Sequence, residues 1–237
     1  MSSSERVTIK YSGDLKVLVI PDQHFPFVNK KALEKLYEIA KAEQPTHIVN
    51  VGDTYDMYSF SRFARSLDVM TPKQEMKKGR KMAEQMWARL QAAAPKAKCF
   101  QVLGNHEERI YKKIMNVAAE YESIIEEPVR KLLTFPGVYT LKSSKSKLVI
   151  NDIVFIHGWS TSPKYHVGYF HQNVVHGHTH RGSVSFVAIK GKSLWELDCG
   201  FIADSNALPL EYRETKTSQW HTGCGLVDKY GPRFIPL

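Results

Sequence analysis

The sequence predicts a single α/β domain that spans residues 1–237. Its first half alternates short apolar runs, typical of buried strands, with amphipathic stretches of helical period, which favours parallel strands covered by helices. Its second half contains several short strands with few helices between them. Apolar residues make up 43% of the chain and charged residues 24%, which is an ordinary globular composition that supports one large core.

The first half begins with two apolar extended runs, at residues 7–11 and 15–20, separated by a Ser-Gly-Asp turn. This arrangement predicts that the two runs pair with each other, as in a hairpin. Alternating helices and strands should follow, and the periodicity predicts them at 29–43 (helix), 47–52 (strand), 73–93 (helix) and 99–104 (strand).

The next helical stretch places Ile110, Ile114, Val117 and Tyr121 on one face, and we expect Pro128 to break it. After this point the chain favours strands, with a tight turn at Lys-Gly-Lys between the last two of them. The expected strands cover residues 137–141, 147–151, 152–158, 172–177, 183–190 and 193–198.

Charge and cysteine content limit the class of protein. Lys and Arg outnumber Asp and Glu by 33 to 24, which favours a polyanionic partner such as nucleic acid, although a solvated lysine-rich surface explains the surplus equally well. The N-terminal stretch lacks the apolar core of a signal peptide, and no segment has the length of a membrane span. Three scattered cysteines form neither a disulfide framework nor a CxxC site, so we expect a cytoplasmic protein without a membrane partner.

Polar residues that can bind metals follow five of the expected strands. Loops at the carboxyl ends of strands gather at one edge of an open α/β sheet, so these residues are expected to lie together. Each one alone is explained by a capping aspartate or a core histidine, whereas five in succession indicate one functional site. The five segments are Asp22-Gln23-His24, Gly52-Asp53-Thr54-Tyr55-Asp56, Gly104-Asn105-His106-Glu107, His157-Gly158 and Gly177-His178-Thr179-His180.

In this order the five segments resemble the motifs of the calcineurin-like metallophosphoesterases, and they extend from residue 22 to residue 180. The resemblance implies a four-layer fold, in which two mixed β-sheets are sandwiched between helical layers and a dinuclear metal site lies at the strand ends. It also implies the metal ligands, which are Asp22, His24 and His180 for one ion, Asn105, His157 and His178 for the other, and Asp53 between them. His176 has no role in the resemblance, and we expect it to be an ordinary strand residue.

Mixed nitrogen and oxygen ligands suit transition metals better than calcium. We therefore expect two divalent ions, manganese first, with iron, zinc, nickel or cobalt as alternatives. By resemblance, a hydroxide bound by both ions attacks phosphorus in line, and His106 acts on the leaving-group oxygen as a catalytic residue. Asp56 would orient His106 through a hydrogen bond, although a helix-capping role explains this aspartate as well.

The motifs also favour one class of phosphoester. Met57 follows Asp56 at the position where protein serine/threonine phosphatases carry an arginine, and the ending Gly177-His178-Thr179-His180 resembles the phosphodiesterase and nuclease branches. We therefore expect a phosphodiesterase that acts on nucleic acid or nucleotides. Two alternatives stay open: a phosphomonoesterase or protein phosphatase, and a non-catalytic scaffold, which the complete ligand set disfavours.

Basic residues near the motifs are candidates for contacts with DNA or RNA, although each also fits an ordinary solvated surface. They are Arg62, Arg109, Lys112 and Lys113, with further basic residues at Arg65, Lys73, Lys77, Lys78, Arg80 and Lys81. Four aromatic residues, Trp159, Tyr165, Tyr169 and Phe170, are candidates to stack on a base, and a core-covering role explains them at least as well.

Overall fold

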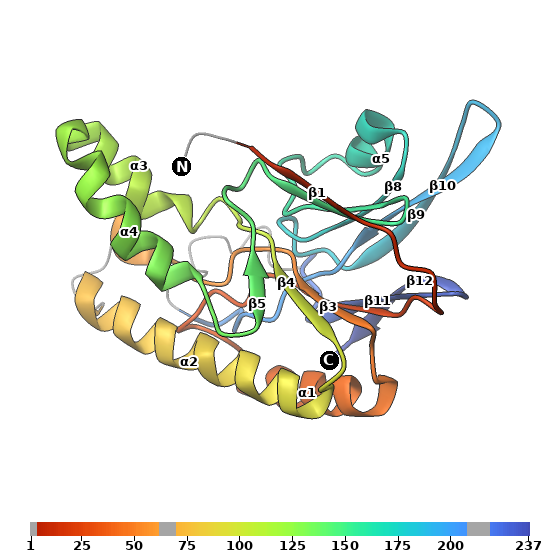
Figure 1. Cartoon of the computed structure of the whole chain (residues 1–237), viewed down its shortest axis with the longest axis horizontal. Helices are drawn as coiled ribbons and strands as arrows, with labels where there is room; N and C mark the ends of the chain where they lie inside the picture. The colour runs from red at the N-terminus through yellow and green to blue at the C-terminus, as the bar shows by residue number, and fades with distance from the viewer. Residues whose placement is uncertain (1–3, 62–69, 208–218) are drawn as a thin grey trace.

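The computed structural model describes residues 4–61, 70–207 and 219–237, which form two six-stranded mixed sheets with helices outside them (Figure 1). Sheet A has the strand order β1-β6-β7-β8-β10-β9, and sheet B has the order β12-β11-β2-β3-β4-β5. The strands are β1 (Arg6–Ile9), β2 (Val17–Ile20), β3 (His47–Asn50), β4 (Lys98–Gln101), β5 (Val138–Thr140), β6 (Lys147–Ile150), β7 (Ile153–Phe155), β8 (Asn173–His176), β9 (Ser183–Ile189), β10 (Lys192–Asp198), β11 (Gly223–Asp228) and β12 (Gly231–Pro236). The helices are α1 (Lys30–Glu43), α2 (Pro72–Ala93), α3 (Glu108–Val117), α4 (Glu122–Leu133) and α5 (Tyr165–Phe170), with 3-10 turns η1 (Tyr58–Phe60) and η2 (Ala119–Tyr121).

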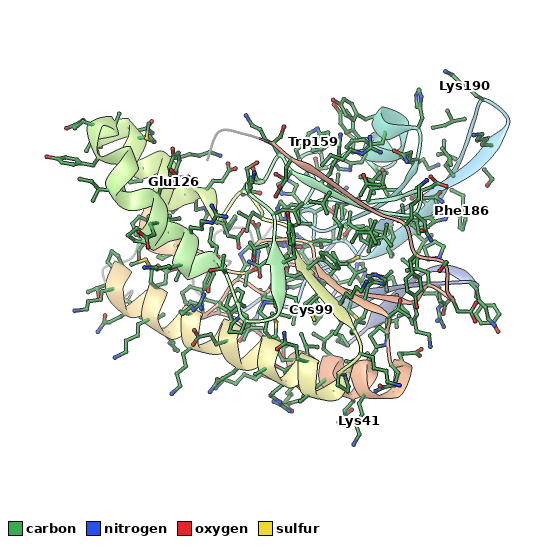
Figure 2. The ribbon with its side chains drawn as sticks, viewed as in Figure 1. Lys41, Cys99, Glu126, Trp159, Phe186 and Lys190 are labelled. Atoms are coloured by element: carbon green, nitrogen blue, oxygen red, sulfur yellow. The ribbon has the colours of Figure 1, made fainter. Side chains whose placement is uncertain are left out.

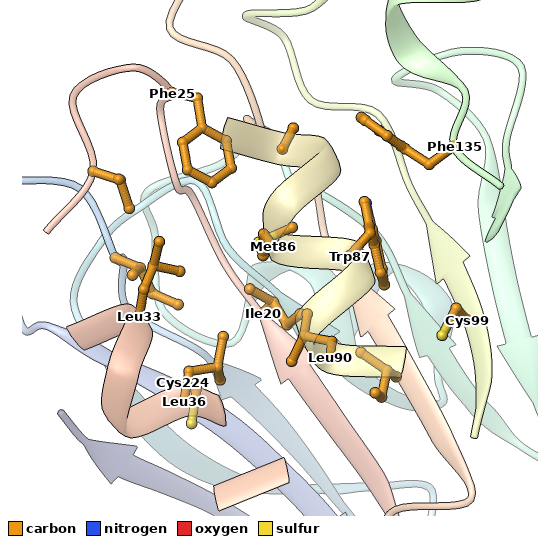
Figure 3. Packing of buried hydrophobic residues seen from close by; sticks show 14 of the residues in the cluster. Ile20, Phe25, Leu33, Leu36, Met86, Trp87, Leu90, Cys99, Phe135 and Cys224 are labelled. Carbon is orange, nitrogen blue, oxygen red and sulfur yellow. The ribbon is translucent and has the colours of Figure 1, made fainter. Parts of the chain in front are cut away.

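Alternating side chains on β2 build the core on both sides of sheet B. Leu18 and Ile20 belong to the apolar layer shared with α1 and α2, which Figure 3 shows with Ile20 near Met86 and Leu90 of α2. Val17 and Val19, one residue out of step, belong instead to the layer between the two sheets. Because side chains alternate faces along a strand, one continuous apolar run can fill two layers of core.

Sheet A repeats this arrangement on its own two faces. Phe155 and Val175 pack in the layer between the sheets, whereas Val154 and Val174 pack on the outer face together with Val167 of α5. The order of layers is therefore helix, sheet, sheet, helix. The four-layer sandwich that the sequence motifs implied is confirmed.

The expected pairing of the first two runs is wrong. β1 pairs in parallel with β6 in sheet A, while β2 lies between β11 and β3 in sheet B. All four residues of β2 are buried, whereas β1 alternates exposed and half-buried residues. A strand that is apolar on both faces needs a central position, and a half-exposed strand fits a sheet edge, so burial sends the two runs to different sheets.

The helical region after β4 also differs from the expectation. α3 ends at Val117, because Ala118 leaves the helical region of the backbone, and Val117 and Tyr121 are 73% and 52% exposed instead of buried. Pro128 does not break the stretch but lies inside α4. A proline there removes one helical hydrogen bond, from the carbonyl of Ile124, and this exposed segment leaves that carbonyl within reach of water.

The expected turn at Lys-Gly-Lys is confirmed. β9 and β10 pair antiparallel, and Lys190 and Gly191 both have positive φ, of 48° and 77°, as a type I′ turn requires. Figure 2 shows Lys190 at the tip of this hairpin, which extends away from the body of the protein. No helix in the described part of the chain combines the length and apolar character needed to cross a membrane.

Candidate metal centre

The seven predicted metal ligands lie just beyond the carboxyl ends of strands from both sheets. Asp22 and His24 follow β2, Asp53 follows β3, Asn105 follows β4, His157 follows β7, and His178 and His180 follow β8. Five of them, Asp22, His24, Asp53, His178 and His180, have positive φ values between 45° and 70°. Such backbone costs roughly 1–3 kcal/mol in residues other than glycine and gathers at functional sites.

One group of donor atoms comes from Asp22, His24 and His180. The Nε2 atom of His180 lies 3.2 Å from Oδ1 of Asp22 and 3.4 Å from Nε2 of His24. His24 Nε2 lies 3.9 Å from the same Asp22 oxygen. All three side chains are at least 97% buried, so their lone pairs converge on one enclosed point.

A second group comes from Asn105, His157 and His178. Oδ1 of Asn105 lies 3.0 Å from Nε2 of His157 and 3.0 Å from Nδ1 of His178, and the two histidine nitrogens are 3.2 Å apart. His178 and His180, which stand two positions apart in the last motif, thus project into different groups. Six of the seven residues therefore form two groups of three donors.

One oxygen of Asp53 lies between the two groups. Oδ2 is 3.3 Å from Nε2 of His157 on one side and 3.9 Å from Nε2 of His24 on the other. The other oxygen, Oδ1, accepts a hydrogen bond from the backbone N–H of His106 at 2.9 Å, which fixes the orientation of the carboxylate. A single carboxylate atom facing two donor sets is the geometry of a bridging ligand.

The donor set fits divalent transition metals. Ions that bind nitrogen and oxygen at 2.0–2.2 Å hold neighbouring ligands roughly 3–3.5 Å apart, which is close to the separations within both groups. Burial alone would lower the pKa of His157, but the carboxylates of Asp53 and Asp22 raise it to about 10. The buried cluster of aspartates and histidines therefore demands positive charge, and it is consistent with a dinuclear metal site.

Further hydrogen bonds hold the donors in these orientations. Nδ1 of His24 donates to Oδ2 of Asp56 at 3.1 Å, and Nδ1 of His157 donates to the carbonyl of Val51 at 3.0 Å. The ring of His180 stacks on Phe201, with a centroid distance of 5.1 Å. Each contact leaves the Nε2 lone pair of the histidine pointing into the site, as outer-shell partners of metal ligands do.

Two glycines are required by the closeness of the aspartates. A Cβ atom on Gly104 would lie 2.0 Å from Oδ1 of Asp53, and one on Gly177 would lie 2.0 Å from Oδ2 of Asp22. The carboxylates therefore rest directly against the backbone of neighbouring loops. These contacts explain why glycine accompanies the polar residues of the motifs.

Glu107 is a structural member of the site whose role the sequence motifs did not reveal. Its fully buried carboxylate accepts hydrogen bonds from the backbone N–H groups of Gly104, Asp53 and Tyr55, at 2.7, 3.1 and 3.0 Å. Burial and the charge of Asp53 raise its pKa to about 7. Glu107 therefore ties the loop after β3 to the loop after β4.

His106 lies beside the two donor groups, with Nε2 3.7 Å from Oδ2 of Asp53. Its Nδ1 donates to the backbone carbonyl of Asp56 at 2.8 Å, and its Nε2 accepts from Nη2 of Arg109 at 2.7 Å. The expected hydrogen bond between Asp56 and His106 is thus made by the backbone carbonyl of Asp56. The carboxylate oxygen Oδ2 of Asp56 lies 3.8 Å from Nδ1 of His106 and accepts a hydrogen bond from His24 instead. Burial lowers the pKa of His106 to about 3, so the ring is neutral in this arrangement.

The candidate nucleic-acid contacts separate into residues near the site and residues away from it. Arg109 lies inside the site, and Lys112 lines an adjoining pocket of about 660 Å³, which we call the side pocket. Lys113 is exposed on α3 and lies outside that lining. Arg62 and Arg65 fall outside the described residues.

The basic face of α2 contains exposed lysines and one arginine with a structural role. Lys73, Lys77, Lys78 and Lys81 are exposed, as a solvated surface requires. The guanidinium of Arg80 instead donates to three backbone carbonyls at the C-terminal end of α4, those of Lys131, Leu132 and Thr134, and pairs with Glu84 at 2.7 Å. Arg80 therefore fixes the contact between α2 and α4.

Comparisons with known proteins identify a family and several similar chains. The family model described as calcineurin-like phosphoesterase matches residues 15–182. The gene 54 protein of Mycobacterium phage D29 is 24% identical over 241 residues, covering 94% of this chain and 93% of that protein. Similar solved structures include the YfcE phosphoesterase from E. coli (16% identity, 91% and 89% of the two chains, TM-score 0.41) and vacuolar protein sorting 29 from Cryptosporidium parvum (14% identity, 92% and 86%, TM-score 0.47).

The family match covers well over half of the chain and includes all five motifs. It ends just beyond His180, the last of the predicted ligands. The protein belongs to the calcineurin-like phosphoesterase family.

Proposed function

We propose that this protein hydrolyses phosphodiesters with two divalent transition-metal ions, manganese first among them. The position of Asp53 Oδ2 between two nearly complete sets of nitrogen and oxygen donors carries the proposal. Asp22, His24 and His180 would hold one ion, and Asn105, His157 and His178 the other. Such ions, when bound, polarise phosphoryl oxygens and lower the pKa of bound water.

The residues beside the donors would bind and orient the phosphate. Arg109 contributes a permanent positive charge, which is partly buried and held by Asp56 through Nη1, and its Nη2 would turn from His106 toward a phosphoryl oxygen. His106 would then present Nε2 to the leaving-group oxygen, while its bond to the Asp56 carbonyl keeps the ring in place. A proton taken up at Nε2 would be the one transferred to the departing oxygen.

Two features favour a diester over a monoester. Met57, at the position of the arginine in protein serine/threonine phosphatases, is 99% buried within the apolar layer against sheet B and cannot reach a phosphate. The side pocket, lined in part by Asn105, His157 and His178, gives space for a second ester arm. A diester carries one negative charge fewer than a monoester dianion and needs this space, so the site suits it better.

The proposal predicts a clear preference in a paired assay. Protein stripped with a chelator and reloaded separately with manganese, iron, zinc, nickel or cobalt should hydrolyse bis-p-nitrophenyl phosphate with a kcat/KM at least about tenfold above that for p-nitrophenyl phosphate. A preference for the monoester would identify a phosphomonoesterase. Hydrolysis of neither ester with any of the five metals would favour a non-catalytic scaffold.

A further inference from the structure

The side pocket has a floor and two walls of different chemistry. Its floor includes Asn105, His157 and His178, three of the proposed ligands. One wall comes from residues 144–147, just before and at the start of β6, and the other from the aromatic segment around α5. Its volume of about 660 Å³ is within the range of pockets that bind small organic ligands.

The aromatic wall is exposed, and its rings contact one another. Trp159 and Tyr169 are 50% and 65% exposed, so the core-covering role expected as an alternative does not describe them, whereas Phe170 packs partly in the core. The Trp159 ring stands perpendicular to Tyr169 at 5.5 Å. Figure 2 shows Trp159 on the same side of the protein as α5. Tyrosine and tryptophan side chains have few rotatable bonds and lose little conformational entropy when they contact a ligand.

A buried polar cluster holds this wall from behind. The backbone N–H of Trp159 donates to Nε2 of His166 at 3.2 Å. The carboxylate of Glu196 accepts from the backbone N–H groups of Lys164 and Val167, at 3.0 and 2.8 Å, and so holds the start of α5 against β10. Because His166 Nε2 accepts a backbone N–H, its proton lies on Nδ1, which disfavours a metal site in this cluster.

The wall formed by residues 144–147 is basic, and its Lys147 ammonium lies 5.1 Å from the centroid of the Phe170 ring. Lys112, Lys145 and Lys147 line the side pocket together with the carboxylate of Glu108. Lys112 pairs with Glu108 at 2.8 Å, which leaves the charges of Lys145 and Lys147 without an opposing carboxylate among the described residues. An aromatic ligand with a positive charge, such as a quaternary ammonium, would be repelled here, whereas an aromatic ligand with phosphate groups would be attracted.

We infer that the side pocket binds one nucleotide unit of the substrate, with the base against Trp159 and Tyr169 and a flanking phosphate near Lys145 and Lys147. The inference rests on the proposed diesterase function and names its substrate class, a phosphodiester that contains a nucleotide. His106 and Arg109 lie outside the pocket lining. If the leaving group lies at His106, the other ester arm, which stays on the phosphate and carries the nucleotide, lies in the pocket.

The test compares two diesters with the same leaving group, so that contacts of p-nitrophenolate cancel. Thymidine 5′-(p-nitrophenyl phosphate) carries a base on the retained arm, and methyl p-nitrophenyl phosphate carries none. The ratio of their kcat/KM values should favour the thymidine ester by about five- to a hundredfold, as base stacking on aromatic side chains provides. Combined Trp159→Ala and Tyr169→Ala changes should remove most of this preference.

The matched control is Tyr230→Ala, because Tyr230 is 81% exposed and lies outside the side pocket. It should leave the ratio of the two kcat/KM values unchanged. A second variant combines Lys145→Gln with Lys147→Gln and keeps the aromatic wall. For a thymidine ester that bears an extra 3′-phosphate on the retained arm, this variant should lower the ratio of its kcat/KM to that of the methyl ester. Equal kcat/KM values for the thymidine and methyl esters would overturn the inference. A kcat/KM for p-nitrophenyl phosphocholine above that for the thymidine ester would overturn it as well.

A binding measurement separates this inference from the proposed function. Fluorescence anisotropy of a labelled single-stranded oligothymidylate, with metal-free protein, should show binding that the Trp159→Ala and Tyr169→Ala changes weaken. If a dithymidine phosphate displaces the labelled oligothymidylate completely, the pocket recognises one nucleotide unit, whether it comes from a dinucleotide or from a strand. If it displaces the label only weakly, binding depends on a longer strand. Absence of hydrolysis of both p-nitrophenyl diesters would reject the diesterase, and absence of binding would reject the pocket.

Discussion

Asp53→Asn is expected to abolish the binding of both metal ions. The change keeps an oxygen that can accept the N–H of His106, but it places an amide N–H₂ group where Oδ2 faces His24 and His157. A donor group cannot bind a cation, so both donor sets lose their shared ligand. Hydrolysis of bis-p-nitrophenyl phosphate should fall by at least about 10³-fold, because the two ions provide several kcal/mol of transition-state stabilisation.

Metal content by mass spectrometry after reloading with manganese gives the direct readout for this variant. The fold should be kept, because the charge of Asp53 repels the buried carboxylates of Asp22 and Glu107 and the asparagine relieves this repulsion. Asp152→Asn, at the exposed turn between β6 and β7, is the matched control and should retain both ions. Two manganese equivalents in Asp53→Asn would contradict the bridging role.

His106→Ala should lower the rate without loss of metal, because His106 lies beside the donor sets and outside them. A positioned acid typically contributes about 10²- to 10⁴-fold. The loss should be small for p-nitrophenolate, which leaves without protonation, and large for an alkoxide such as a ribose hydroxyl. His178→Ala serves as the contrast and should lose metal and activity together.

Rates on activated and natural diesters, measured beside the metal content, decide this prediction. Equal losses on both esters with full metal content would remove His106 from the leaving group. The backbone carbonyl of Asp56, and not its carboxylate, orients His106. Asp56→Asn should therefore act mainly through His24, weakening metal binding instead of changing the dependence on the leaving group.

The metal centre could be predicted from the sequence because its residues follow apolar strands directly. A strand such as 47–50 is recognisable by composition, and the residue after it lies at the sheet edge wherever the strand is placed. The pairing of β1 and β2 could not be predicted in this way. Their local pattern says that both are strands, whereas their partners, β6 for β1 and β3 for β2, lie far along the chain.

The side pocket shows the same limit at the level of a binding site. Trp159 was a candidate base-stacking residue from the sequence, but Lys145 and Lys147 were not, because nothing in their local sequence connects them to it. They line the same pocket because β6 and β7 are neighbours in sheet A. The role of Glu107 likewise depends on contacts between two loops, after β3 and β4, that only the folded chain brings together.

The central claim is that two metal ions share Asp53. Crystals of the protein soaked in manganese, with diffraction measured near the manganese absorption edge, test it most directly. We predict two anomalous peaks about 3.5–4 Å apart, one beside Asp22, His24 and His180 and the other beside Asn105, His157 and His178, with the Asp53 carboxylate between them. A single peak, or peaks away from Asp53, would contradict the account.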